Sequence, residues 1–127
     1  MELRLVPNSR EYWDFIRNLR NLNVGFKEQV SISVEQQDSY MAKYGKNYYI
    51  ALLGDVPVGF VGAVDDDIRL ATDPLHRRSG VGEFMIMEIV KIFPNASAKV
   101  LAGNNSSRGL FEKCGFTESF RIYEKNN

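Results

Sequence analysis

Residues 81–93 are apolar at positions that would point in every direction around a helix. A helix that is apolar all round is not stable on a surface, so it has to be packed between other layers. Pro94 cannot donate a backbone hydrogen bond and ends the helix. The sequence therefore predicts a layered fold built around this helix, and its 127 residues suit a single domain.

The remaining pattern predicts the other elements. A first strand stops at Pro7, and Asn8, with Glu11 three residues on, is expected to cap a helix over residues 9–22. A capping box of Ser33 and Gln36 predicts a second helix that ends near Gly45. Alternating and β-branched residues predict strands at 48–53, 58–64, 68–72, 98–102 and 116–125, with a helix at 105–115 closed by Gly115. This order predicts one α/β domain over residues 1–127, with a mixed, mostly antiparallel sheet flanked by about four helices.

Composition narrows the classes of function. The 16 basic and 16 acidic side chains cancel, so we expect neither nucleic acid nor a membrane as a partner. The single cysteine, Cys114, excludes an internal disulfide and a cysteine-rich zinc site, and no metal site is expected. Because the first residues lack the apolar core of a signal peptide, we expect a cytoplasmic protein, and a homodimer is compatible with the sequence.

A glycine-rich turn, "HRRSGVG" at 76–82, lies directly before the apolar helix. A strand, a turn and a helix N-terminus in this order aim free backbone N–H groups and the helix dipole at one point, which favours a phosphate. Gly80 and Gly82 would let the backbone approach the anion, and Arg77 and Arg78 can add charge-assisted hydrogen bonds. The alternative is a tight turn whose glycines only permit close helix packing. The turn matches neither the P-loop nor the dinucleotide fingerprint.

Two segments carry a family resemblance. "DPLHRRSGVGEFMI" resembles motif A of the GCN5-related N-acetyltransferases, in which Arg or Gln is followed by two residues, Gly, one residue, and Gly or Ala; Arg77, Gly80 and Gly82 match it. About twenty residues later, "NNSSRGLFEKCGF" resembles the family's second signature, matched by Asn104, Phe111, Gly115 and Phe116. The resemblance covers residues from about 48 to 127, and two signatures in order are more specific than one.

The resemblance implies acetyl-CoA as the co-substrate and an amine as the acceptor. The turn amides would hold the pyrophosphate, and the pantetheine arm would pair with the strand 68–72, which this fold splays away from the strand 98–102. A backbone N–H of Leu70 or Ala71 would polarise the thioester carbonyl. The residues that the resemblance places at the cofactor are Leu70, Ala71, Thr72, Arg77, Arg78, Ser79, Gly80, Val81, Gly82, Asn104, Ser107 and Phe111.

The resemblance also implies the acid–base groups. Asp66 falls where histone-acetylating relatives place a glutamate, so it is the candidate general base, although "VDDDI" is also a typical polar turn. Phe111 stands where the family has a tyrosine acid, so the thiolate leaves either unassisted or with help from water, Ser106 or Ser107. Asn104 is expected to cap a helix, His76 to lie at the edge of the turn, and Cys114 to be a small buried residue.

The acceptor site of this fold is built largely from the first two helices and their loop, here residues 18–45. This stretch is polar and aromatic but not acidic, and it faintly resembles acetyltransferases that act on nucleotide-linked amino sugars. A protein N-terminus, a lysine or a small amine is the alternative acceptor. A noncatalytic acyl-CoA sensor or interaction module is the alternative from another class, favoured by the missing tyrosine.

Overall fold

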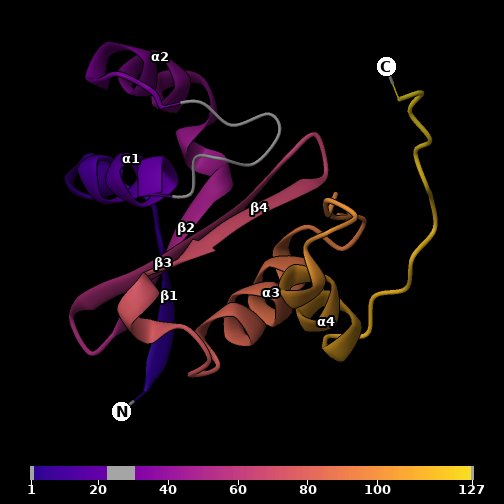
Figure 1. The fold of residues 1–127 in the computed structure, drawn as a ribbon. Helices are drawn as coiled ribbons and strands as arrows, with labels where there is room; N and C mark the ends of the chain where they lie inside the picture. Colours follow the sequence, from indigo (N-terminus) through magenta and orange to yellow (C-terminus); the bar gives the residue numbers. More distant parts are fainter. Residues whose placement is uncertain (1, 23–30, 127) are drawn as a thin grey trace.

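The computed structural model describes residues 2–22 and 31–126, and its centre is a four-stranded antiparallel sheet (Figure 1). The strands lie side by side in the order in which they follow one another along the chain. They are β1 (Leu3–Pro7), β2 (Tyr48–Leu53), β3 (Val56–Val64) and β4 (Asp67–Thr72). The expected strands in this part of the sequence are confirmed to within two residues.

Helices cover both faces of the sheet (Figure 1). On one face lie α1 (Trp13–Leu22), which follows the 3-10 helix η1 (Arg10–Tyr12), and α2 (Val34–Tyr44), which runs into η2 (Gly45–Asn47). On the other lie α3 (Val81–Ile92) and α4 (Asn105–Lys113), with η3 (Pro74–His76) between β4 and α3. Each face therefore has its own hydrophobic core, and the predicted α/β architecture with four helices is confirmed.

Helix α3 occupies the layer predicted for it. Met85, Ile86 and Ile89 are fully buried in the core between the sheet, α3 and α4. A Cβ at Gly59 of β3 would lie 2.9 Å from the end of the Met85 side chain and from the Ala71 carbonyl oxygen. The absence of a side chain at Gly59 thus lets the helix approach the central strand closely.

Of the N-caps predicted for the first two helices, one is correct and one is wrong. The capping box of α2 is present: the Gln36 amide donates to Ser33 Oγ at 3.2 Å, and the Ser33 amide donates to Gln36 Oε1 at 2.8 Å. Asn8 does not cap the first helix, because its side chain donates to the Gly45 carbonyl at 3.2 Å and ties β1 to the end of α2. The chain instead enters α1 through η1, with Ser9 at its N-cap.

The two strands predicted after α3 are wrong. Residues 98–102 and 116–125 form no strand, and the only pairing after α3 in the described ranges is one parallel bridge between Asp67 and Ser97. A strand needs a neighbour that supplies hydrogen bonds as well as a suitable sequence. In Figure 1 the C-terminal segment stands apart from the sheet and from every helix. None of the described helices has the length and apolar character needed to cross a membrane.

Candidate active site

The turn between η3 and α3 leaves backbone donors open. Gly80, the N-cap of α3, adopts a left-handed conformation with φ of 87°, and Arg78 does so with φ of 62°. The first helical hydrogen bond runs from the Phe84 amide to the Gly80 carbonyl at 3.0 Å. The amides of Val81, Gly82 and Glu83 therefore precede the helical ladder and are directed out of the helix N-terminus, as an anion site requires.

Glycine is needed at positions 80 and 82 of the turn for different physical reasons. A Cβ at Gly80 would meet no atom within 4 Å, so the positive φ alone explains glycine there. A Cβ at Gly82 would lie 2.9 Å from Leu110 Cδ2, so Gly82 brings α3 and α4 close together. The packing interpretation thus holds for Gly82, whereas Gly80 is explained by the conformation of the turn, and anion binding by this turn stays a prediction.

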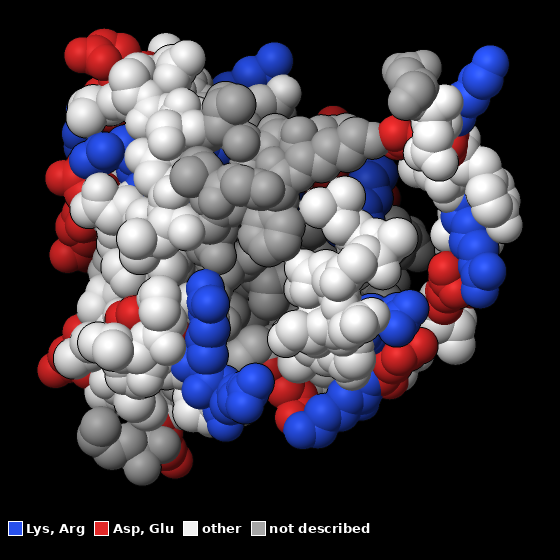
Figure 2. Space-filling view, in the orientation of Figure 1, with Lys and Arg blue, Asp and Glu red and all other residues white. Residues whose placement is uncertain are grey.

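Charged side chains surround the turn. Asp73 caps η3 by accepting a hydrogen bond from the Leu75 amide at 3.2 Å, and its other carboxylate oxygen lies 3.5 Å from His76 Nδ1. Ser79 Oγ donates to the His76 carbonyl and closes the turn. Figure 2 shows Lys and Arg side chains gathered over η3 and the turn before α3. The local charge thus suits an anion although the whole chain is neutral.

The free edge of β4 carries a second set of open donors. The Ile68 amide donates to the Ser97 carbonyl at 2.8 Å, away from β3, whereas the Asp73 amide donates to Val58 of β3 at 2.8 Å. Since backbone direction alternates along a strand, the amides of Leu70 and Thr72 face the free edge with Ile68. The amide of Ala71 faces β3, so Leu70 is the one of the two predicted donors that can meet a ligand.

The edge opens at a fork. The Ser97 amide donates to the Asp66 carbonyl at 2.8 Å, and together with the bond from Ile68 this forms the single bridge between β4 and the next segment. Beyond Ser97, residues 98–102 make no further pairing with β4. β4 and this segment thus diverge as the resemblance predicts, and the amides of Leu70 and Thr72 lie in the opening.

Asp66 belongs to the hairpin that joins β3 and β4. Asp65 and Asp66 form its two-residue loop, both with positive φ, 53° and 60°. Two left-handed residues are typical of a type I′ turn, in which Asp is one of the favoured residue types. Asp66 is exposed and lies four residues from Leu70, about 13 Å along an extended strand. The turn explains Asp66 completely as a structural residue, and its catalytic role stays a prediction.

The second signature builds helix α4 as expected. Asn104 caps the helix by accepting a hydrogen bond from the Ser107 amide at 3.1 Å. At the other end Gly115 has φ of 92°, its amide donates to Glu112 at 3.0 Å, and the Phe116 amide donates to Phe111 at 3.0 Å. These are the two bonds of a Schellman motif, and they confirm the predicted helix end.

Phe111 and Cys114 both face inward. Phe111 is buried in the core, and its ring packs edge to face on Phe116 with centroids 5.2 Å apart. Its contact with a cofactor stays a prediction, because the described contacts are with the core. Burial raises the pKa of the half-buried Cys114 thiol, and the Glu83 carboxylate adds to this. A raised pKa does not suit a nucleophile.

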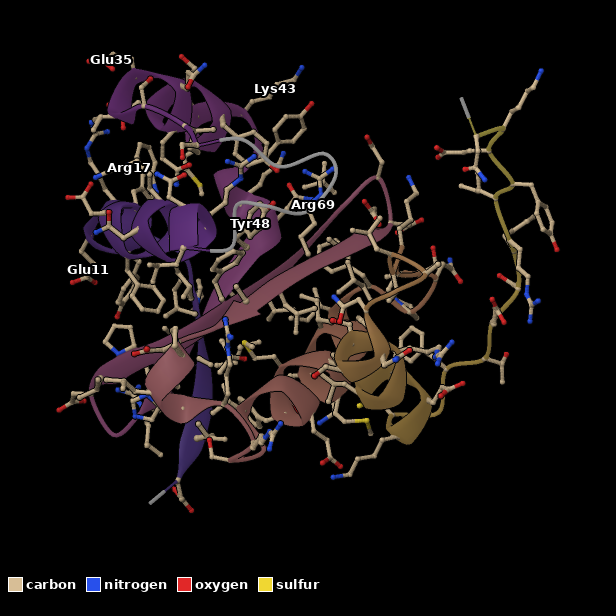
Figure 3. All side chains as sticks on the ribbon, viewed as in Figure 1. Glu11, Arg17, Glu35, Lys43, Tyr48 and Arg69 are labelled. Carbon is tan, nitrogen blue, oxygen red and sulfur yellow. The ribbon has the colours of Figure 1, made fainter. Side chains whose placement is uncertain are left out.

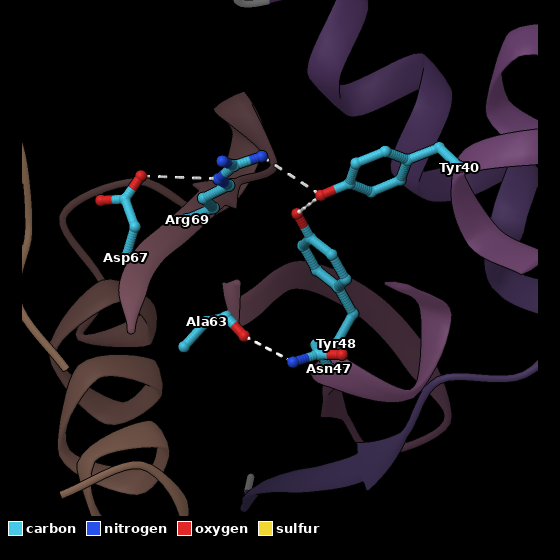
Figure 4. A network of polar contacts seen from close by, with 6 residues as sticks. All are labelled: Tyr40, Asn47, Tyr48, Ala63, Asp67 and Arg69. Atoms are coloured by element: carbon cyan, nitrogen blue, oxygen red, sulfur yellow. Dashed lines mark hydrogen bonds and ion pairs between the residues drawn. The ribbon is translucent and has the colours of Figure 1, made fainter. Parts of the chain in front are cut away.

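A polar network that the sequence analysis missed lies on the opposite face of β4, toward α1 and α2 (Figures 3 and 4). The hydroxyls of Tyr40 and Tyr48 are 2.7 Å apart, Arg69 donates to the Tyr40 hydroxyl at 3.2 Å, and Arg69 Nε lies 3.6 Å from the Asp67 carboxylate. Burial raises the pKa of the Tyr48 phenol above its ordinary value, and the hydrogen bond to Tyr40 adds to the rise. Tyr48 is therefore a neutral hydroxyl at physiological pH.

A glycine makes room for this network. Tyr48 pairs with Gly62 of β3, which in turn pairs with Arg69 of β4. A Cβ at Gly62 would lie 2.6 Å from Tyr48 Cδ1, so the tyrosine ring lies across β3 where β3 has no side chain. One signal was visible in the sequence: Asp67, directly before the predicted strand 68–72, and Arg69 within it are charged residues two positions apart, which places them on the same face of an extended chain.

The predicted acceptor region is described only in part. Residues 23–30 of the loop between α1 and α2 lie outside the described residues. An open pocket next to this region is lined by Phe15, Asn18, Leu19 and Leu22 of α1 and by Asp73 after β4. Elsewhere in the described part of the chain, no group of three His, Cys, Asp or Glu side chains comes together as a metal site would.

A layered α/β fold with open amides at a helix N-terminus and along a neighbouring strand edge defines a class of protein suited to an extended, phosphate-bearing ligand. The chain belongs to the acetyltransferase (GNAT) family, whose model matches residues 13–116. No curated protein sequence matches it.

Solved structures agree on the fold. A spermidine N-acetyltransferase from Vibrio cholerae, in complex with CoA and spermine, has a TM-score of 0.81 at 19% identity over 97% of this chain and 85% of that chain. An aminoglycoside N-acetyltransferase with a CoA bisubstrate analogue has a TM-score of 0.78 at 15% identity over 100% and 99%. The ribosomal-protein-S18-alanine N-acetyltransferase from Escherichia coli has a TM-score of 0.70 at 16% identity over 94% and 80%.

Proposed function

We propose that this chain transfers the acetyl group of acetyl-CoA directly to a primary amine. The observation that carries the proposal is the fork beside the glycine turn, which leaves two sets of backbone donors open: the amides of Leu70 and Thr72 at the free edge of β4 and the amides of residues 81–83 at the N-terminus of α3. Relatives with this fold are described in complex with CoA or a CoA analogue, which supports the choice of ligand.

The turn and the strand edge bind different parts of acetyl-CoA. The amides of residues 81–83 bind the pyrophosphate, and the neighbouring Arg77 and Arg78 add positive charge. The edge of β4 pairs with the extended pantetheine arm like an added strand. The Leu70 amide donates to the thioester carbonyl and stabilises the negative charge that develops on its oxygen during attack.

The transfer itself forms a C–N bond and breaks a C–S bond. The neutral amine attacks the thioester carbon, the amine gives up a proton, and the thiolate leaves as CoA and takes one up. Asp66 is the proposed acceptor of the amine proton, and its distance of about 13 Å along the strand from Leu70 requires a chain of water molecules. Because a free thiol has a pKa of about 8.5, the thiolate leaves without a tyrosine acid, and water, Ser106 or the half-buried Ser107 supplies its proton.

The acceptor class follows from Arg69. Its guanidinium is held by Tyr40 and Asp67, yet 47% of the side chain is exposed, which leaves N–H donors of the guanidinium for a ligand. It lies one residue from Leu70, on the face toward α1 and α2. A fixed guanidinium binds carboxylate or phosphate, so we propose an amine acceptor that also carries an acidic group, such as a nucleotide-linked amino sugar.

An acceptor screen tests this proposal. The chain is incubated with acetyl-CoA and one acceptor class at a time: amino-sugar nucleotides, amino acids, neutral small amines, polyamines and peptides, and CoA release is measured. Arg69→Gln is expected to raise KM at least tenfold for the acidic acceptor and to leave a neutral amine unaffected. Arg4→Gln is the matched control, because Arg4 lies on β1, the strand farthest from β4, and pairs with the exposed Asp55 at 3.2 Å.

Three outcomes separate the alternatives. Preference for an acidic acceptor that depends on Arg69 supports the proposal. Turnover only with polyamines, peptides or neutral amines keeps the acetyltransferase and overturns the acceptor class. CoA binding measured by calorimetry without acetylation of any acceptor overturns the enzyme in favour of a noncatalytic acyl-CoA-binding module.

A further inference from the structure

The network of Tyr40, Tyr48 and Arg69 holds one hydroxyl proton more than its own contacts can use. Each tyrosine has one phenol proton, and the two oxygens are 2.7 Å apart, so one of the protons lies between them. Arg69 donates to the Tyr40 oxygen at 3.2 Å. A guanidinium has donors and no acceptor, so neither phenol proton can be directed at Arg69. The second proton therefore needs an acceptor outside this network.

Burial decides which tyrosine has the spare proton. Tyr48 is 4% exposed, and Tyr40 is the only acceptor that the described residues offer to its hydroxyl. If the Tyr40 proton lay between the two oxygens, the Tyr48 proton would be buried without an acceptor, which is unfavourable. The Tyr48 hydroxyl therefore donates to Tyr40. The raised pKa of the Tyr48 phenol agrees, because burial and the hydrogen bond to Tyr40 both favour the form that keeps its proton.

The Tyr40 hydroxyl is thus a free donor in a fixed position. The hydrogen bonds from Arg69 and Tyr48 converge on its oxygen (Figure 4), which leaves its own O–H directed away from both. The Tyr40 ring is half-buried and packs on Tyr44, with centroids 5.0 Å apart, and on Tyr48, with centroids 6.0 Å apart. These ring contacts hold the hydroxyl in place, and no residue in the described ranges accepts its proton.

Arg69 places further donors next to this hydroxyl. Its bond to Tyr40 uses one of five N–H groups, and its Nε lies 3.6 Å from the Asp67 carboxylate. Tyr40 and Asp67 therefore hold the guanidinium from two sides, while 47% of the side chain stays exposed. Because Arg69 Nη1 and the Tyr40 oxygen are only 3.2 Å apart, one carboxylate or phosphate group can accept from both residues at once.

We propose that Tyr40 donates its hydroxyl proton to the same acidic group of the amine acceptor that Arg69 binds. This inference rests on the acceptor site proposed at Arg69 and adds a second specificity-determining residue to it. The bond from Tyr40 is directional, so it fixes the acidic group on the Tyr40 side of the guanidinium. A neutral amine gains nothing from either donor. Carboxylate and phosphate oxygens share the chemistry that this pair recognises.

The first experiment compares the acetylation of two acidic amines with that of matched neutral amines. γ-Aminobutyrate is paired with butylamine to test a carboxylate, and UDP-glucosamine with glucosamine to test a phosphate. Tyr40→Phe is expected to raise KM about tenfold for the better acidic acceptor, with kcat and the neutral amines unchanged. Tyr44→Phe is the matched control, because it removes a hydroxyl from the same helix α2 and keeps the ring that packs on Tyr40.

A second set of variants tests the direction of the hydrogen bond. Tyr40→Phe removes the acceptor of the buried Tyr48 hydroxyl, so it is expected to melt at a lower temperature. The double variant Tyr40→Phe/Tyr48→Phe removes both hydroxyls and is expected to recover the melting temperature while KM stays raised. Tyr48→Phe alone is expected to leave KM within about twofold, because the Tyr40 proton is directed elsewhere. If Tyr48→Phe lowers KM, the Tyr40 proton had been held between the two hydroxyls, which overturns the proposal.

Arg69→Gln separates this inference from the proposed function. If neither acidic amine is acetylated, or if Arg69→Gln leaves KM unchanged for both, the proposed acceptor class fails and this inference with it. If Arg69→Gln raises KM whereas Tyr40→Phe behaves like Tyr44→Phe, the acceptor class stands and only the role of Tyr40 is overturned. Adding Tyr40→Phe to Arg69→Gln is expected to raise KM several-fold further. No further rise would mean that Tyr40 only positions Arg69, which also overturns the proposal.

Discussion

Gly62→Ala is expected to destabilise the protein because two rigid groups surround Gly62. A Cβ there would lie 2.6 Å from Tyr48 Cδ1 and 2.7 Å from the Asn47 carbonyl oxygen. Tyr48 is 4% exposed and its hydroxyl is bound to Tyr40, so the ring has no free space to move into. Overpacking of a core by one methyl group costs about 1–3 kcal/mol, which lowers the melting temperature of a domain of this size by about 5–15 °C.

Thermal unfolding followed by circular dichroism measures the effect, with Gly109→Ala as the control. Gly109 lies inside α4 and a Cβ there would meet no atom within 4 Å, so alanine is expected to stabilise the helix by about 0.5–1 kcal/mol. The reasoning about Tyr48 is refuted if Gly62→Ala melts with the unaltered chain while Gly109→Ala melts higher. Because the ring reaches the network at Arg69, Gly62→Ala is also expected to raise KM for an acidic acceptor.

Four further outcomes are expected. Gly80→Ala, at φ of 87°, distorts the turn at a cost of about 1–2 kcal/mol and weakens CoA binding about tenfold in calorimetry; unchanged affinity would separate the turn from the ligand. Asp66→Asn, which tolerates the positive φ, lowers kcat/KM chiefly at acidic pH and leaves CoA affinity alone; an unaltered pH profile reduces Asp66 to a turn residue. Phe111→Leu costs about 1–2 kcal/mol in urea unfolding, mainly by losing the contact with Phe116, with no change in kcat at saturating acetyl-CoA. The raised pKa of Tyr48 means that the folded chain holds this proton above pH 10 whereas the unfolded chain loses it, so the free energy of unfolding falls as pH rises above 10; Tyr48→Phe is expected to flatten that fall, and an identical slope contradicts it.

Local signals predicted well. The apolar residues of α3, the Ser33–Gln36 capping box and the closing Gly115 each concern residues a few positions apart, where helix geometry alone decides the contact. Asn8 satisfied the same local pattern but bonds to Gly45, far along the sequence, and that tertiary contact decided its position.

Contacts between residues far apart in the sequence could not be predicted from it. Tyr40 and Arg69 are 29 positions apart in the sequence and form a hydrogen bond. The need for glycine at position 62 is explained only by the ring of Tyr48, which lies over it in the structure. The prediction of two C-terminal strands was wrong for a related reason, since residues 98–102 and 116–125 have strand sequences but no strand partner among the residues that the structure describes. Strand formation depends on a neighbour, and no pattern along one segment reveals whether the neighbour is there.

The bridge between Asp67 and Ser97 limits the length of the free edge of β4. It closes the fork at Ile68, so an extended ligand that enters beside Thr72 can run along four residues, about 13 Å, before it meets paired backbone. One more bridge of the same kind would occupy the Leu70 amide and shorten that run by about half. In the proposed complex, the length of strand edge with which an acyl carrier can pair is therefore set by the place where these two backbones stop pairing.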